Sequence, residues 1–115
     1  MSDMDLRALC MGFTGAEETY PFSAEASVFK VRGKIFAMRH SLHEADRWSL
    51  WCKAPPGAQP VIVASDPTRF FVPPYVGGKG WIGAYLDVDQ DWEELADLID
   101  ESYRMTAPKR LVDQL

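Results

Sequence analysis

The sequence predicts an α+β fold in which an antiparallel sheet is flanked by helices. Two observations carry this prediction. Residues 28–39 and 47–53 alternate between apolar and polar side chains, as half-buried strands do. Two other segments, near the two ends of the chain, repeat apolar residues at helical spacing. The chain has 115 residues, of which 47% are hydrophobic and 25% charged, and this fits a single globular domain over residues 1–115.

The first expected element is a helix near the N-terminus, capped by Ser2 and ended by the segment 12–15. Its apolar stripe consists of Leu6, Leu9, Cys10 and Phe13. Residues 17–27 follow as an ordered connector, because a residue before proline, such as Tyr20, is disfavoured in the α conformation.

Residues 28–39 predict a β-hairpin whose two-residue type II′ turn is Gly33-Lys34. This turn pairs Arg32 with Ile35, Val31 with Phe36 and Phe29 with Met38. The pairing assigns each side chain to one face of the sheet. The face toward the core is expected to carry Phe29, Val31, Phe36 and Met38. The solvent face is expected to carry Val28, Lys30, Arg32, Ile35, Ala37 and Arg39.

Three further segments complete the predicted sheet region. Residues 47–53 predict a strand with Trp48, Leu50 and Cys52 toward the core and Arg47, Trp51 and Lys53 on the opposite face. The run 61–64 is ambiguous between helix and strand, and the nearby Pro60 favours a short helix. The prolines after residues 70–72 exclude a central strand there. Residues 81–86 predict a strand with Ile82, Ala84 and Leu86 on one side and Trp81, Gly83 and Tyr85 on the other.

The last long element is a helix that begins with an acidic capping box, Asp91 and Glu94. Its buried stripe is expected to be Trp92, Leu95, Ala96, Ile99 and Tyr103. The segment 106–108 ends this helix, and residues 109–115 leave room for a short terminal one.

The net charge of −5 argues against general attraction to nucleic acid or to anionic membranes. The charges are nevertheless segregated, with six cations and two acids in residues 28–53 and eight acids without a cation in residues 87–101. One hypothesis is a cationic sheet face with aromatic platforms, joined by the glycine-rich loop 75–81. The candidate DNA- or ligand-binding residues are Lys30, Arg32, Lys34, Arg39, Arg47, Trp51, Lys53, Tyr75, Lys79 and Trp81. The competing interpretation, favoured by the need of such a sheet for one solvated face, is that these cations are ordinary surface residues.

No catalytic constellation is evident, so we expect no enzymatic activity and no cofactor. The loop 77–80 lacks the spacing of a phosphate-binding P-loop, and no serine lies in a nucleophile elbow. His40 and His43 form a weak metal site at best, and the two cysteines fit reduced core residues. Neither a secretory signal nor a membrane-spanning run is evident, which predicts a cytoplasmic protein that does not bind membranes.

Three blocks of the sequence resemble the MmcQ/YjbR family of small bacterial proteins. They are Glu17-Glu18-Thr19-Tyr20-Pro21-Phe22, the hairpin segment 28–37, and Pro74-Tyr75-Val76-Gly77 with Lys79-Gly80-Trp81. The resemblance implies an α+β fold related to frataxin-like, secretion-chaperone-like and double-wing domains, and a DNA-binding role. Other members often carry a more basic, His- and Asn-containing segment after the tyrosine that matches Tyr75. Here that segment has one cation, Lys79.

Three functions remain open at this point. DNA binding is the function that the resemblance implies. A protein-interaction or small-ligand module could instead use the Tyr75–Trp81 region and the Trp-bearing sheet edge as a groove. The third possibility, metal binding by the acidic helix, is the weakest, because hard cations require several oxygens that converge on one point.

Overall fold

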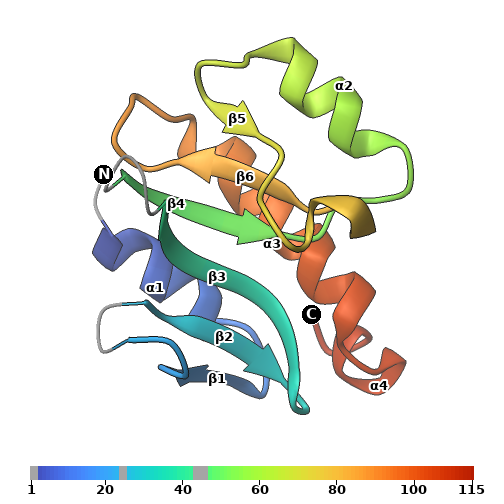
Figure 1. Ribbon diagram of the computed structural model, residues 1–115. Coiled ribbons are helices and arrows are strands. Elements are labelled where there is room, and N and C mark those ends of the chain that lie inside the picture. The colour runs from blue at the N-terminus through green and yellow to red at the C-terminus, as the bar shows by residue number, and fades with distance from the viewer. Residues whose placement is uncertain (1–2, 24–25, 43–46) are drawn as a thin grey trace.

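One antiparallel sheet of six strands forms the centre of the fold (Figure 1). The computed structural model describes residues 3–23, 26–42 and 47–115. The strands are β1 (Ala16–Thr19), β2 (Val28–Val31), β3 (Lys34–Leu42), β4 (Arg47–Cys52), β5 (Phe70–Phe71) and β6 (Ile82–Tyr85). Their order across the sheet is β1-β2-β3-β4-β6-β5. The predicted α+β class is therefore confirmed.

The helices α1 (Asp3–Met11) and α3 (Trp92–Thr106) pack against one side of this sheet, which we call the helix face. In Figure 1 both lie behind the strands. A shorter helix, α2 (Ala58–Ser65), lies beside β5 and β6, and α4 (Lys109–Val112) follows α3. The main core on the helix face contains the buried residues Leu6, Cys10, Phe29, Val31, Phe36, Ala37, Leu50, Phe70, Ala84, Leu95, Ile99, Tyr103 and Leu111.

Several sequence predictions are confirmed in detail. The ambiguous run 61–64 is helical, and it lies within α2. The side chain of Asp91 caps α3 by accepting hydrogen bonds from the backbone N–H groups of Glu93 and Glu94. Leu95, Ile99 and Tyr103 are buried as predicted. Ser2, the predicted cap of the first helix, lies outside the described residues.

The predicted hairpin register is wrong by one position at the turn. Val31 pairs with Lys34, so the turn residues are Arg32 and Gly33, both with positive φ, at 52° and 79°. This is the backbone of a type I′ turn, which needs a left-handed conformation at both central positions. The sequence offers one glycine for this turn, Gly33. Arg32 therefore has to adopt the other left-handed conformation, which residues with a side chain rarely adopt.

A β-bulge then changes which side chains of β3 share a face. Phe29 pairs with Ala37 and Lys30 pairs with Ile35, which leaves Phe36 as the extra residue. Phe36 and Ala37 both join the helix-face core. Met38, predicted to lie in that core, consequently lies on the opposite side of the sheet, which we call the outer face. Arg39, predicted for the solvent face, lies on the helix face, with its guanidinium 3.7 Å from the centre of the Trp48 ring.

The connector predicted for residues 17–27 contains an edge strand. Residues 16–19 form β1, which pairs with β2 over its whole length, from Ala16 with Val31 to Thr19 with Val28. Two consecutive glutamates conceal this strand in the sequence, because acidic residues are depleted in strands. Glu18 is held by Arg7 of α1, whose Nε lies 2.8 Å from Oε1, and by the hydroxyl of Ser27 at 2.8 Å from Oε2.

Candidate functional site

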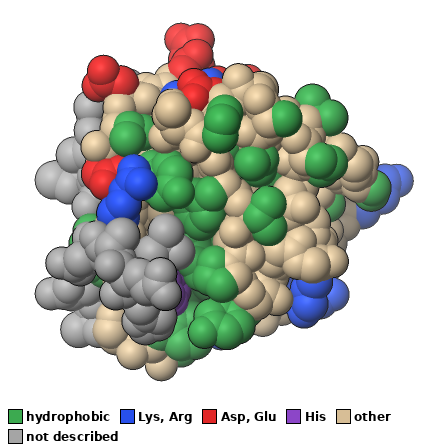
Figure 2. Space-filling model, turned by 45° about the horizontal axis from the view of Figure 1, so that its top comes forward, with side chains coloured by type: hydrophobic (Ala, Val, Ile, Leu, Met, Phe, Trp, Pro, Cys, Tyr) green, Lys and Arg blue, Asp and Glu red, His purple; other side chains and the backbone are tan. Residues whose placement is uncertain are grey.

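The outer face of the sheet is hydrophobic rather than cationic. Val28, Met38, Trp51 and Trp81 are buried there, and Ile35, Phe71 and Val76 pack against them. A groove of about 670 Å³ crosses this face. Its lining residues are Pro21, Phe22, Ile35, Met38, His40, Trp51, Tyr75 and Val76. Figure 2 shows hydrophobic side chains gathered across the middle of the molecule, with Lys and Arg side chains both at its right-hand margin and at its left, beside acidic side chains.

The floor of the groove is an aromatic layer with its polar atoms satisfied. The rings of His40 and Trp51 stack with centroids 4.5 Å apart, and Phe22 meets His40 edge-on at 6.0 Å. The indole Nε1 of Trp51 donates to the hydroxyl of Ser49 at 2.8 Å, and that hydroxyl donates to the carbonyl of His40 at 3.0 Å. Trp51 is 2% exposed, so its ring is almost wholly covered by its neighbours. This floor offers mainly apolar contact.

Tyr75 lies at the rim of the groove, and its backbone conformation and its exposure distinguish it from the other lining residues. Its φ is +68°, which places a bulky side chain in the left-handed region. Its side chain is nevertheless 86% exposed, the largest value among the large hydrophobic residues of the described chain. Strained backbone of this kind concentrates at ligand clamps and functional sites.

Hydrogen bonds from α2 hold the segment that carries Tyr75. The side-chain amide of Gln59 donates to the carbonyls of Gly77 and Trp81, at 2.8 and 2.6 Å. Between these two residues the chain forms η1, a 3-10 turn over Gly77–Lys79. The groove wall is therefore held in place by the fold, as expected of a largely pre-formed ligand site.

The structure separates the cations predicted to share a surface. Arg39 lies on the helix face, and Arg32 occupies the hairpin turn with a φ of 52°. Arg47 is engaged by Asp87, with Nε–Oδ2 and Nη2–Oδ1 distances of 2.7 Å each, and it covers the Tyr85 ring. The described sheet therefore carries no continuous cationic face, because the bulge places Arg39 on the helix face, Arg32 lies in the turn, and Asp87 neutralises Arg47.

Three of the predicted lysines are near enough for their charges to interact. Burial lowers the pKa of Lys53, and the positive charges of Lys34 and Lys79 lower it further. None of the three lines the groove: Lys34 pairs with Val31, whose side chain lies in the helix-face core, and the N–H of Lys79 donates to the Val76 carbonyl at 3.0 Å. We call Lys34, Lys53 and Lys79 the lysine group. Lys30 is the cross-strand partner of Ile35, but it also pairs with Glu17 of β1.

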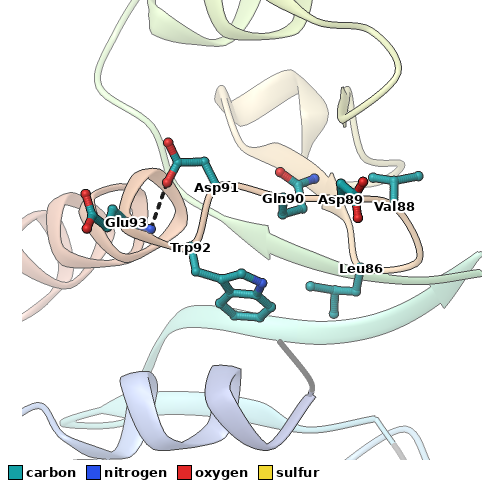
Figure 3. A pocket seen from close by; sticks show the side chains of 7 residues that line it. All are labelled: Leu86, Val88, Asp89, Gln90, Asp91, Trp92 and Glu93. Atoms are coloured by element: carbon teal, nitrogen blue, oxygen red, sulfur yellow. Dashed lines mark hydrogen bonds between the residues drawn. The ribbon is translucent and has the colours of Figure 1, made fainter.

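A second pocket of about 400 Å³ lies at the start of α3 and is more polar (Figure 3). It is lined by Leu86, Val88, Asp89, Gln90, Asp91, Trp92 and Glu93. The carboxylate of Asp91 is already engaged as the helix cap, with Oδ1 3.0 Å from the Glu93 N–H. Among the described residues, no three His, Cys, Asp or Glu side chains are grouped so that they could hold a metal ion. His43, half of the weak histidine pair, lies outside those residues.

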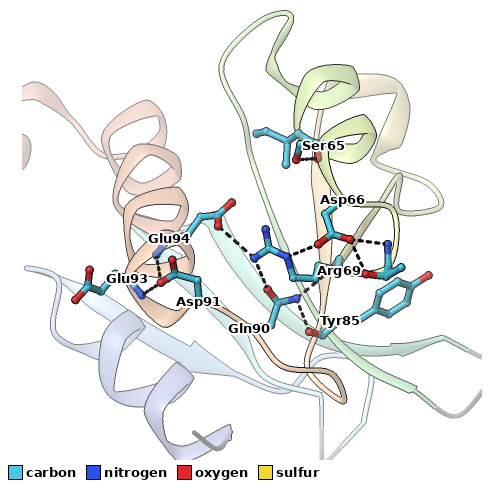
Figure 4. Close-up of polar contacts among 10 residues, drawn as sticks. Ser65, Asp66, Arg69, Tyr85, Gln90, Asp91, Glu93 and Glu94 are labelled. Carbon is cyan, nitrogen blue, oxygen red and sulfur yellow. Dashed lines mark hydrogen bonds and ion pairs between the residues drawn. The ribbon is translucent and has the colours of Figure 1, made fainter.

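A polar network joins the β5 region to α3 (Figure 4). Arg69 bonds Asp66 and Glu94, with N–O distances of 2.9 and 3.2 Å, and its guanidinium lies over the Phe70 ring. The amide of Gln90 donates to the carbonyls of Arg69 and Tyr85, at 3.1 and 2.8 Å. These contacts fix the edge strand against the helix, and they leave Glu94 committed to a structural role.

Six groove residues are absent from the ten candidates, although Val76 falls within the predicted loop 75–81: Pro21, Phe22, Ile35, Met38, His40 and Val76. Pro21 and Phe22 lie in the segment expected to be a connector, and Met38 was expected in the helix-face core. Of the ten candidates, Trp51 and Tyr75 line the groove, and Trp81 is buried beside it. A sequence signal existed for two of the missed residues. Ile35 and Met38 fall on the same face of β3, although they are three positions apart, because the bulge adds Phe36 between them.

The fold and the site define a small α+β domain with an apolar groove on the sheet face opposite α1 and α3. A family model described as YjbR matches residues 11–105, and the chain belongs to that family. A solved Deinococcus radiodurans protein with a DUF419 domain is similar, with 26% identity, a TM-score of 0.77, and coverage of 90% of this chain and 77% of that one. A Pseudomonas syringae protein, 14% identical, shares the fold with a TM-score of 0.79 and coverage of 92% and 99%. A search of curated proteins finds no match.

Within the ranges that the structure describes, helix length and hydropathy give no candidate for a membrane-spanning helix.

Proposed function

We propose that this YjbR-family chain is a non-enzymatic binding protein whose ligand site is the outer-face groove. The observation that carries the proposal is the combination of a pre-formed apolar cavity with a strained, exposed aromatic at its rim. A volume of about 670 Å³ lies in the range of small-molecule sites. Phe22, 64% exposed, and Tyr75 leave a hydrophobic opening that a monomeric surface rarely keeps without a partner.

The groove offers few groups that could take part in catalysis. Its lining offers one imidazole and one phenol among six apolar side chains, with no carboxylate or thiol. The two cysteines are buried, and burial raises the pKa of each thiol, that of Cys52 to about 12. Both therefore stay protonated and weakly nucleophilic at neutral pH.

The test is binding of a neutral fluorescent probe, phenylnaphthylamine, to the folded protein. We expect saturable fluorescence enhancement with the wild type, and weakening of at least about fivefold for Tyr75→Ala and Phe22→Ala, which remove exposed lining surface. Tyr20→Ala is the matched control, because Tyr20 is 49% exposed but does not line the groove. Equal affinity in all four proteins would contradict the assignment. Near-UV circular dichroism establishes that each variant is folded.

DNA binding, which the family resemblance implied, is the second candidate, and the lysine group is the observation that favours it. Three neighbouring ammonium groups could neutralise phosphates even though the chain carries a net charge of −5. The acidic α3 would then have to point away from the duplex.

An electrophoretic mobility assay with a labelled duplex at low salt tests this second function. Lys79→Glu and Lys34→Glu should weaken binding and reduce the slope of log affinity against log salt by about one per lost contact. Lys109→Glu, an exposed lysine on α4, is the control for net charge. Unshifted DNA at tens of micromolar wild-type protein would reject the function.

A further inference from the structure

We infer that the groove binds a small, uncharged molecule that contains an aromatic ring, and that the rings of Phe22 and Tyr75 determine this selectivity. The inference rests on the proposed function and assigns a ligand class to its groove. Because a volume of about 670 Å³ suits a small molecule, we assign the ring to a free ligand rather than to a side chain of a partner protein.

The first argument is which part of the lining a ligand can reach. Phe22 is 64% exposed and Tyr75 is 86% exposed, and both line the groove. The floor residues Met38 and Trp51 are only 6% and 2% exposed. Pro21, the other exposed lining residue, adds a rigid apolar ring. A ligand therefore meets mainly ring surface, and aromatic pairs gain stabilisation beyond that of the apolar area they bury.

The second argument is the order of rings from the buried Trp51 to the exposed Phe22. His40 lies between them, stacked on Trp51 at 4.5 Å and met edge-on by Phe22 at 6.0 Å. The imidazole Nδ1 lies 2.7 Å from the carbonyl oxygen of Ser41, a hydrogen bond that orients this ring. A ligand ring placed against Phe22 would continue the row in the offset or edge-on geometry that aromatic pairs prefer.

The third argument is that the fold holds the Tyr75 ring in position. The N–H of Val76 donates to the Pro74 carbonyl at 2.7 Å, and with a φ of +68° at Tyr75 this matches a classic γ-turn, which is rare and strained. The next residue, Gly77, is held by the side-chain amide of Gln59 at 2.8 Å. The chain therefore maintains an unfavourable backbone conformation that exposes this ring. A ring already in position loses little entropy when a ligand stacks on it.

The fourth argument is that the lining disfavours a charged ligand. Within the described chain, the residues that line the groove include no Lys, Arg, Asp or Glu. The indole N–H of Trp51 is already donated to the Ser49 hydroxyl. A phosphate or carboxylate placed among these side chains would lose hydration without gaining an ionic partner, which is costly. Charge complementarity therefore favours an uncharged ligand.

The test compares two competitors of phenylnaphthylamine that share a carbon skeleton and differ in aromaticity. Naphthol and decahydronaphthol each carry one hydroxyl and are uncharged at neutral pH. We expect the wild type to bind naphthol about three- to tenfold more tightly than decahydronaphthol.

Three variants assign this preference to particular rings. Tyr75→Leu and Phe22→Leu keep apolar surface but remove a ring. Each should reduce the preference at least about twofold, while the affinity for decahydronaphthol changes by less than about twofold. Tyr20→Leu is the matched control and should retain the preference, because Tyr20 is 49% exposed and does not line the groove.

The outcomes separate this inference from the proposed function. Equal competition by the two alcohols would overturn the aromatic class and leave the groove standing as a general apolar site. No saturable binding of phenylnaphthylamine would overturn both. A preference unchanged in Tyr75→Leu and Phe22→Leu, or reduced as much in Tyr20→Leu, would refute the role of the two rings. Tighter competition by N-acetyltryptophanamide, a neutral model of a tryptophan side chain, would reassign the groove to a partner protein.

Discussion

Replacing Ser102 by alanine should lower the free energy of unfolding by about 2 to 4 kcal/mol, although this removes only one oxygen atom. Ser102 lies on α3 and is fully buried. Its hydroxyl donates to the carbonyl of Phe36 at 2.5 Å and accepts from the N–H of Lys53 at 2.9 Å. Phe36 is the bulge residue and has no partner in the register of either neighbouring strand. The alanine variant therefore leaves two backbone groups without this partner, at about 1 to 3 kcal/mol each.

Urea unfolding, followed by tryptophan fluorescence and by far-UV circular dichroism, measures this loss. We expect a lower transition midpoint with an unchanged m-value, because the surface exposed on unfolding is the same. The matched control is Ser65→Ala, in which the lost hydroxyl bonds only to the Ile62 carbonyl within α2 and is exposed. That variant should stay within about 0.5 kcal/mol of the wild type. A Ser102→Ala loss no larger than the control would refute the argument that this hydroxyl holds the bulge.

Three further outcomes follow from the structure. Gly33→Ala should cost about 1 kcal/mol, because φ is +79° there, whereas Gly78→Ala, without positive φ or close neighbours, should be nearly neutral in the same urea assay. Cys10 and Cys52 should not react with a thiol reagent in the native state and should both react in denaturant, since both are buried; fast native labelling would contradict this. Lys53→Met should stabilise the protein by less than about 1 kcal/mol near neutral pH, since the pKa of Lys53 is lowered in the folded state and its charge is partly screened. The wild type should recover this difference as pH rises toward the ordinary lysine value of 10.5; a difference that is constant with pH would contradict the role of charge.

The sequence was sufficient to predict the elements whose signals are local. The capping box at Asp91 and the stripe of Leu95, Ile99 and Tyr103 defined α3, because cap chemistry and a 3.6-residue period act within one segment. The alternation of residues 47–52 assigned Leu50 and Trp51 to opposite faces correctly. In each of these cases the pattern and the structure are governed by the same few neighbouring residues.

The site could not be predicted, because it depends on two non-local features. The bulge at Phe36 is compensated by Ser102, which lies 66 residues away, and no pattern in the hairpin itself reveals that partner. The second feature is the approach of the segments around Phe22 and Tyr75 to the outer face. Their exposed aromatics have no period of their own, and only the folded chain places them beside Met38.

The bulge determines which side chains form the floor of the groove. A regular β3 would have turned Met38 toward the helices and Arg39 toward the outer face, as the sequence pattern predicted, and the floor of the groove would then have been charged. The extra residue inverts this arrangement, so that an apolar floor lies next to Trp51 while Arg39 covers Trp48 on the helix face. One inserted residue therefore converts the middle of the surface expected for a polyanion into an apolar groove.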